Sequence, residues 1–144
     1  MSYSRPSADR FVEAIRTACR GPIEDGTVSF TVDRGDAETV ARLEPAVSGG
    51  PRLELRMTGN VGELFLDDLD PFEVDEALPE DVEEFASFTR ALVDGELELH
   101  FRKTLFGWRP AAVEWPGGRW SLPGIPGVVG LFFRSHREKV RGYS

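Results

Sequence analysis

The densest group of chemically active side chains is a run of carboxylates near the middle of the chain. Clustered carboxylates can bind a hard cation such as Ca²⁺, which takes six or more oxygen ligands from a loop bent around it. Here the alternation of acids fails after Asp70, Pro71 interrupts the loop, and no glycine lies between residues 63 and 94. We therefore predict no metal site, and interpret the run as a solvated loop that caps the following helix or as a surface that binds a partner. The candidate partner-binding residues are Asp67, Asp68, Asp70, Asp75 and Glu76.

The residues that usually supply nucleophiles, bases and zinc ligands are few. His100, His136 and Cys19 are the only histidines and the only cysteine, and a structural zinc site needs four such ligands. Cys19 falls on the apolar stripe of a predicted helix, where we expect a buried structural thiol. No glycine pattern resembles a phosphate-binding loop. The sequence thus predicts no catalytic residue and no cofactor, and we expect a non-catalytic protein.

Basic and aromatic residues are interleaved in the last third of the chain. Residues 100–144 contain eight bases and two acids, and all three tryptophans lie between positions 108 and 120. Basic groups beside stacking aromatics are typical of sites for single-stranded nucleic acid or phosphate-bearing ligands. Tryptophans on one hairpin also predict a cross-strand aromatic cluster on the core, which we favour. The candidate ligand-binding residues are Arg102, Trp108, Trp115, Arg119 and Trp120.

The net charge of −8 is unevenly distributed. Residues 57–89 contain eleven acids and no base, whereas residues 100–144 carry an excess of bases. The acidic and basic segments either pair with each other within the fold or form two surfaces of opposite charge. The overall acidity argues against nucleic acid as a partner, because the acidic segment would repel phosphate unless the fold holds it on the far side.

The elements that must position these residues follow from hydrophobic periodicity. Phe11, Ile15 and Cys19 recur at helical spacing, and Gly21-Pro22 predicts the end of that helix. A turn at 33–36 favours a strand over residues 37–47, with a short helix capped by Asp36 as the alternative. Alternation of apolar and polar residues predicts further strands over 27–32 and 53–57. Residues 61–66 are apolar on both parities apart from Glu63 and predict a central strand covered on both sides.

The second half of the chain contains the clearest helix, which Pro79 opens and Gly95 ends. Residues 122–127 cannot form regular structure, and residues 128–140 have the apolar spacing of an amphipathic helix. Strands are predicted over 96–103, 108–115 and 119–122. The order of elements predicts an α+β fold, namely an antiparallel sheet of six to seven strands with an N-terminal, a central and a C-terminal helix packed on it.

The length of 144 residues fits a single globular domain over 1–144. The first ten residues contain no apolar run that would predict a signal peptide, and the apolar run at 128–133 is too short to cross a bilayer. We expect a cytoplasmic protein that makes no membrane contact. The apolar Pro/Gly segment 122–133 is a candidate surface for self-association.

Two functional hypotheses remain. The first is a non-catalytic interaction protein that uses the acidic surface of residues 63–84 to meet a macromolecular partner with a basic surface. The second is a small-ligand-binding domain or enzyme, whose aromatic and arginine-lined cavity would lie between the sheet and the C-terminal helix and include Phe132 and Phe133.

Overall fold

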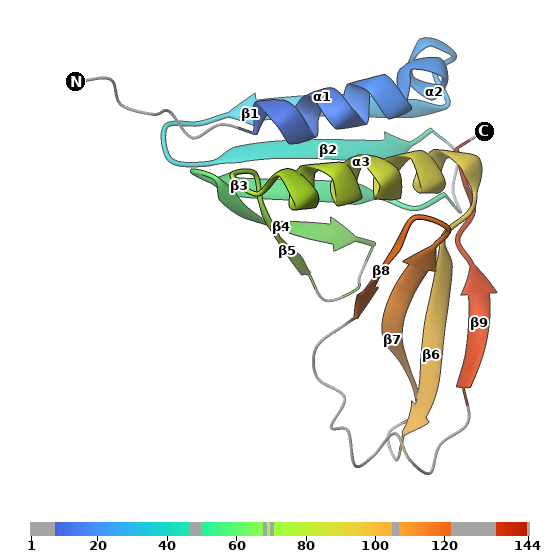
Figure 1. The fold of residues 1–144 in the computed structure, drawn as a ribbon. Helices are drawn as coiled ribbons and strands as arrows, with labels where there is room; N and C mark the ends of the chain where they lie inside the picture. The colour runs from blue at the N-terminus through green and yellow to red at the C-terminus, as the bar shows by residue number, and fades with distance from the viewer. Residues whose placement is uncertain are drawn as a thin grey trace.

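Two antiparallel sheets and three helices form the protein in a computed structural model, which describes residues 8–46, 50–67, 69, 71–104, 107–121 and 135–143 (Figure 1). The helices are α1 (Asp9–Ala18), α2 (Arg20–Glu24) and α3 (Pro79–Asp94). The first sheet is a meander of β1 (Val28–Arg34), β2 (Thr39–Pro45), β3 (Leu53–Thr58), β4 (Val61–Leu66) and β5 (Phe72–Asp75). The second sheet contains β6 (Glu98–Thr104), β7 (Gly107–Trp115), β8 (Gly118–Ser121) and β9 (Ser135–Lys139), in the order β8-β7-β6-β9.

The core lies between the first sheet and the helices α1 and α3, which run side by side over one face (Figure 1). Each helix contributes an aromatic ring at their contact, where the Phe11 and Phe85 centroids are 4.6 Å apart. The sheet contributes the inward positions of its alternating strands, such as Leu43, Leu55 and Leu64, all of which are buried. The pattern confirms that alternation marks strands with one apolar face.

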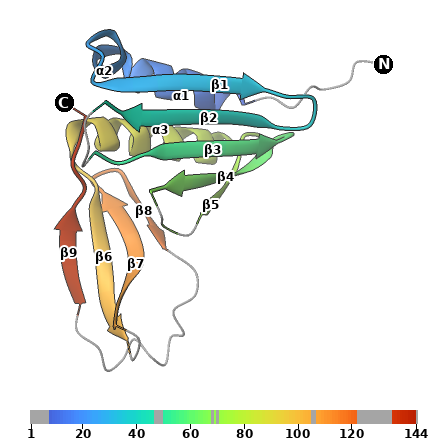
Figure 2. The same ribbon diagram turned by 180° about the vertical axis from the view of Figure 1, so that it is seen from behind.

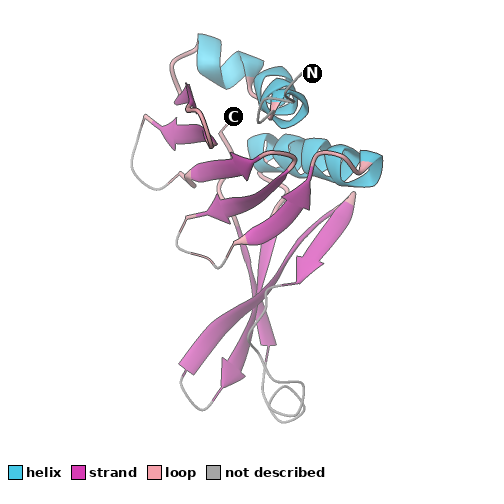
Figure 3. Ribbon diagram, turned by 90° about the vertical axis from the view of Figure 1, so that its left-hand side faces the viewer, coloured by secondary structure: helices cyan, strands magenta, loops and turns pink. Residues whose placement is uncertain are grey.

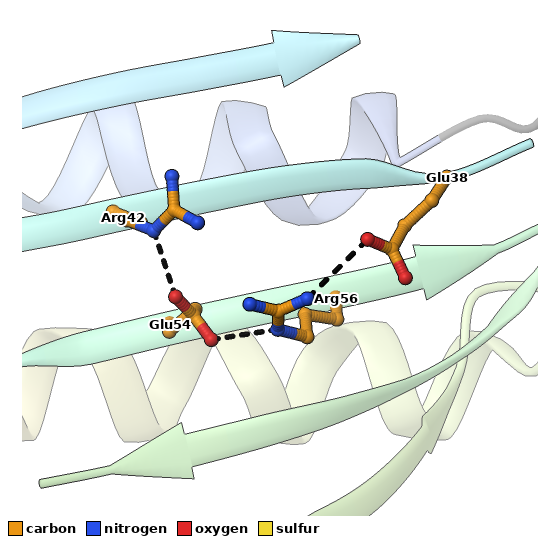
Figure 4. A network of polar contacts seen from close by, with 4 residues as sticks. All are labelled: Glu38, Arg42, Glu54 and Arg56. Atoms are coloured by element: carbon orange, nitrogen blue, oxygen red, sulfur yellow. Dashed lines mark hydrogen bonds and ion pairs between the residues drawn. The ribbon is translucent and has the colours of Figure 1, made fainter. Parts of the chain in front are cut away.

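No helix covers the other face of the first sheet (Figure 2). The outward positions of β2 and β3 include charged residues. The Glu54 carboxylate accepts hydrogen bonds from Arg42 Nε at 2.7 Å and Arg56 Nε at 2.8 Å, and Arg56 also reaches Glu38 at 3.4 Å (Figure 4). Burial raises the pKa of Glu54, but the two guanidinium groups more than offset this, so the pKa lies below its ordinary value. Through this network, the guanidinium of Arg56 is bound to two carboxylates of the same sheet.

The second sheet extends away from the helices as an arm, here called the arm sheet (Figures 1 and 3). Its root is tied to the body by the chain that follows β9. Gly142 packs so closely on Gly95 that an added Cβ would lie 2.5 Å from the Gly95 nitrogen. The buried Tyr143 hydroxyl then donates a hydrogen bond of 2.6 Å to the Pro51 carbonyl oxygen, just before β3.

The α+β class with antiparallel sheets is confirmed, as are the strand at residues 39–45 and the helix opened by Pro79. The predicted C-terminal helix is wrong over residues 135–139, which form β9 and pair with β6. The apolar residues that suggested a helix lie at 128–133, outside the described residues, whereas a charged strand can pair along a sheet edge with both faces wet. In the described ranges, nine strands divide into sheets of five and four, not one sheet of six to seven.

Two smaller predictions also need correction. Gly21-Pro22 does not end the helical region, because both residues lie in α2, where a proline in the first turn removes no intrahelical hydrogen bond. The acidic loop contains β5, in which buried Phe72 and Val74 alternate with Glu73 and Asp75.

No helix in the described part of the chain is long and apolar enough to cross a membrane.

Candidate functional site

A cleft lies between β5, the last strand of the first sheet, and β8, the edge strand of the arm sheet. It combines the acidic and the aromatic-basic segments that the sequence singled out. Its volume of about 690 Å³ falls in the range of small-ligand and side-chain pockets. The residues that line the cleft are Glu63, Pro71, Phe72, Glu73, Arg119, Trp120 and Ser121.

The inner wall of the cleft is aromatic. The Trp120 ring lies 5.0 Å from Phe72, 4.5 Å from Phe88 of α3, and 5.0 Å from Trp115 on the neighbouring strand. The Trp115 indole donates to Ser87 Oγ at 2.9 Å, and the Trp120 indole donates to the Glu84 carboxylate. Since both indole N–H groups have partners, the two rings are held in fixed orientations.

The β7–β8 hairpin explains why these two rings meet. Trp115 pairs with Gly118 and Val113 with Trp120, so alternation directs both tryptophans to the core-facing side of the hairpin. An added Cβ at Gly118 would lie 2.7 Å from the Trp115 ring, which is why this position needs glycine. The predicted aromatic cluster on the core therefore accounts for Trp115, which is 5 % exposed, and for the inner side of Trp120.

The outer wall carries two carboxylates that face each other. Glu63 of β4 and Glu73 of β5 are directly opposite in the strand register, and both are exposed. Like charges in this arrangement repel across an antiparallel pair. Arg56 is opposite Glu63 on β3, and its guanidinium, which is bound to Glu54 and Glu38, also attracts the Glu63 carboxylate. Within the described ranges, neither Glu63 nor Glu73 forms an ion pair.

Arg119 completes the lining on the β8 side. Its guanidinium contacts the Glu114 carboxylate at 3.1 Å, so its charge is offset within the arm sheet. Among the described strands, β5 and β8 are the terminal strands of their sheets, so each has one backbone edge that no described strand uses. The cleft thus offers a rigid aromatic surface, two exposed carboxylates and backbone donors and acceptors.

The predicted partner-binding acids are mostly engaged in local structure. Asp67, at φ 50°, accepts a hydrogen bond from the Arg52 N–H at 2.8 Å. Asp75 accepts from the Ala77 N–H at 2.9 Å, and Glu76 is only 6 % exposed. Asp68 and Asp70 lie outside the described residues. The exposed acids of the cleft, Glu63 and Glu73, fall within the predicted acidic surface of residues 63–84 but were not among the five residues named as partner-binding.

The predicted ligand-binding residues separate into two groups. Trp115, Arg119 and Trp120 lie at or behind the cleft, whereas Arg102 and Trp108 lie toward the free end of the arm sheet. Phe132 and Phe133 are outside the described residues. The cavity was expected against a C-terminal helix, but residues 135–139 form β9 instead.

The histidines and the cysteine do not come together. Cys19 is buried in the core, and burial raises the pKa of its thiol to about 12. His100 lies on β6, where its Nε2 is 3.5 Å from a Glu114 carboxylate oxygen, and His136 lies on β9. In the described part of the chain, no three potential metal ligands form a group.

A second hollow of about 780 Å³ lies along the helices α1 and α3. Its lining mixes both charges, with Arg10 and Arg90 beside Glu13 and Asp94, and includes none of the residues predicted to bind a partner or ligand. We place the candidate site in the cleft because there the opposed carboxylates and the ordered aromatic wall occur together.

Comparisons with protein-family models, with curated proteins and with solved structures found no match for this chain. The function must therefore be argued from the site.

Proposed function

We propose that this protein is a non-catalytic binding protein that holds a basic segment of a macromolecular partner in the cleft between β5 and β8. The observation that carries the proposal is the pair of opposed, exposed carboxylates of Glu63 and Glu73 beside the aromatic wall. A cationic side chain placed between the two carboxylates would relieve their repulsion. It would also interact favourably with an indole face.

The shape of the cleft suits an extended peptide. The two strand edges can donate and accept backbone hydrogen bonds, as in recognition by strand addition, while the carboxylates select a lysine or arginine. The exposed acids of α3, such as Glu80 and Glu83, line a separate hollow together with Gly117 of the β7–β8 turn and would attract a basic partner over longer distances.

A second candidate is a small cationic ligand in the same cleft, which the volume of about 690 Å³ favours. Unlike an extended peptide, such a ligand would need no hydrogen bonds from the backbone edges of β5 and β8. An amine-bearing small molecule would then compete with a basic peptide for Glu63 and Glu73.

Binding of a fluorescent hexa-arginine peptide, followed by anisotropy, tests the proposal. Each exposed charge pair at about 4 Å contributes about 1 kcal/mol in water, so E63Q/E73Q should weaken binding by about 2 kcal/mol, or about 30-fold. The matched control is E13Q/E24Q, which removes two exposed acids of α1 and α2. Equal loss in both double variants would mean that only net charge matters, and the cleft assignment would then be wrong.

A further inference from the structure

Three aromatic rings form a cluster toward the free end of the arm sheet, one from each of three neighbouring strands. Phe101 of β6 is stacked on His136 of β9, with centroids 4.9 Å apart and planes at 10°. Trp108 of β7 meets His136 edge-on at 4.4 Å. Trp108 is 43 % exposed, whereas Trp115 is 5 % exposed and Trp120 is half-buried, so Trp108 is the most exposed tryptophan of the arm.

Cations lie on both faces of the two strands that carry Phe101 and Trp108. Lys103 is directly opposite Trp108 in the register, and its Nζ lies 5.9 Å from the centroid of the indole ring. On the other face of the same two strands, Arg102 and Arg109 are directly opposite each other. This juxtaposition of like charges is unfavourable, and neither side chain has an ion-pair partner among the residues that the structure describes. Both are exposed.

Most acids of the chain lie elsewhere, although Glu138 of β9 is on the arm sheet and its Oε1 lies 3.3 Å from His136 Nε2. The described acids of segment 57–89 lie in or beside β4, β5 and α3, and the arm sheet extends away from these elements (Figures 1 and 3). Charges separated by more than about 8 Å are largely screened at physiological ionic strength. The fold thus meets the condition under which a basic, aromatic segment can accept phosphate despite a net charge of −8.

We propose that the free end of the arm sheet, formed by Phe101, Arg102, Lys103, Trp108, Arg109 and His136, binds single-stranded nucleic acid. A base would stack on the exposed face of Trp108, and flanking phosphates would contact Lys103, Arg102 and Arg109 at the end of the β6–β7 hairpin. A ligand that carries only negative charge would contact Lys103, Arg102 and Arg109 but would make no use of the exposed Trp108 ring. The surface shares no residue with the cleft, so this inference is independent of the proposed function.

Anisotropy with a labelled single strand of about twelve mixed nucleotides, as DNA and as RNA, tests the inference at about 50 and 200 mM salt. W108A should weaken binding by roughly 5- to 150-fold. R102E/R109E should abolish binding at the higher salt, and R102Q/R109Q should reduce the slope of log K against log salt by about 1.4. The control R20E/R90E makes the same change in net charge at exposed arginines of α2 and α3 and should retain binding better than R102E/R109E.

Poly-glutamate serves as a polyanion without bases. If it competes as well as the single strand and W108A has no effect on nucleic-acid binding, the surface binds acidic polypeptide and the inference is wrong. Absence of binding at about 50 mM salt, or equal losses in R102E/R109E and R20E/R90E, also overturns it. Circular dichroism and thermal melts confirm that each variant is folded. E63Q/E73Q should retain single-strand binding, which separates this result from the outcome for the cleft.

Discussion

Neutralising one carboxylate of the cleft should make the free protein more stable. Glu63 and Glu73 are directly opposite on β4 and β5, with the neighbouring Arg56 bound to Glu54 and Glu38. Two unit charges about 5 Å apart in water repel by about 0.8 kcal/mol. Salt screening and divergence of the two side chains reduce this, so we expect E73Q to raise the free energy of unfolding by about 0.5 kcal/mol, within the range for cross-strand pairs. E63Q should gain less, because Glu63 is also attracted by Arg56.

Urea denaturation of the single and double variants at low salt measures this effect. The double variant should gain no more than either single variant, because the first substitution already removes the repulsion. The gain should disappear at about 1 M salt, where the Debye length is about 3 Å. E54Q is the matched control on β3 and should change stability in the opposite direction, since Glu54 accepts hydrogen bonds from two arginines. Loss of stability in E63Q and E73Q, or independent additive gains, would refute the reasoning.

Three further predictions concern groups away from the cleft. Because the pKa of Glu54 is lowered, its network stabilises the fold above the ordinary glutamate pKa and loses this contribution as the pH falls through the lowered value. In the acid range, the free energy of unfolding should therefore fall less steeply with pH in E54Q than in the wild type. Y143F removes the donor to a buried Pro51 carbonyl and should cost about 1–3 kcal/mol in urea denaturation. Native Cys19 should resist a thiol reagent at pH 8 and react after unfolding, because burial raises its thiol pKa to about 12; prompt reaction in the native state would contradict its burial.

Local patterns predicted most of the elements, and long-range pairing accounts for the main errors. The alternation in β1 and β3 and the apolar stripe of α3 are consequences of one buried face, and a short stretch of the sequence displays them. The expectation that β4 is covered on both sides is wrong, because Val61 and Glu63 are exposed. β9 contains no aliphatic or large hydrophobic residue, and it is a strand because it pairs with β6, about 35 residues away in the chain. Similarly, the division into two sheets depends on which edges pair.

The candidate site could be predicted only in part. The density of acids drew attention to residues 67–76, but Asp67 and Asp75 accept hydrogen bonds from nearby backbone N–H groups and Glu76 is buried. Such local roles depend on turn geometry that acid density does not reveal. The meeting of Trp120 with Phe72 and the opposed glutamates requires two sheet edges to approach each other, which no local pattern in the sequence encodes.

The three tryptophan indole N–H groups provide the most direct test of binding in the cleft. They report separately on the cleft (Trp120), the core behind it (Trp115) and the free end of the arm sheet (Trp108). In a ¹H–¹⁵N NMR titration with hexa-arginine peptide, the account predicts that the Trp120 indole signal and the backbone signals of β5 and β8 shift, that Trp108 does not, and that E63Q/E73Q removes these shifts. Shifts confined to the exposed acids of α3, or an unchanged response in E63Q/E73Q, would contradict binding in the cleft.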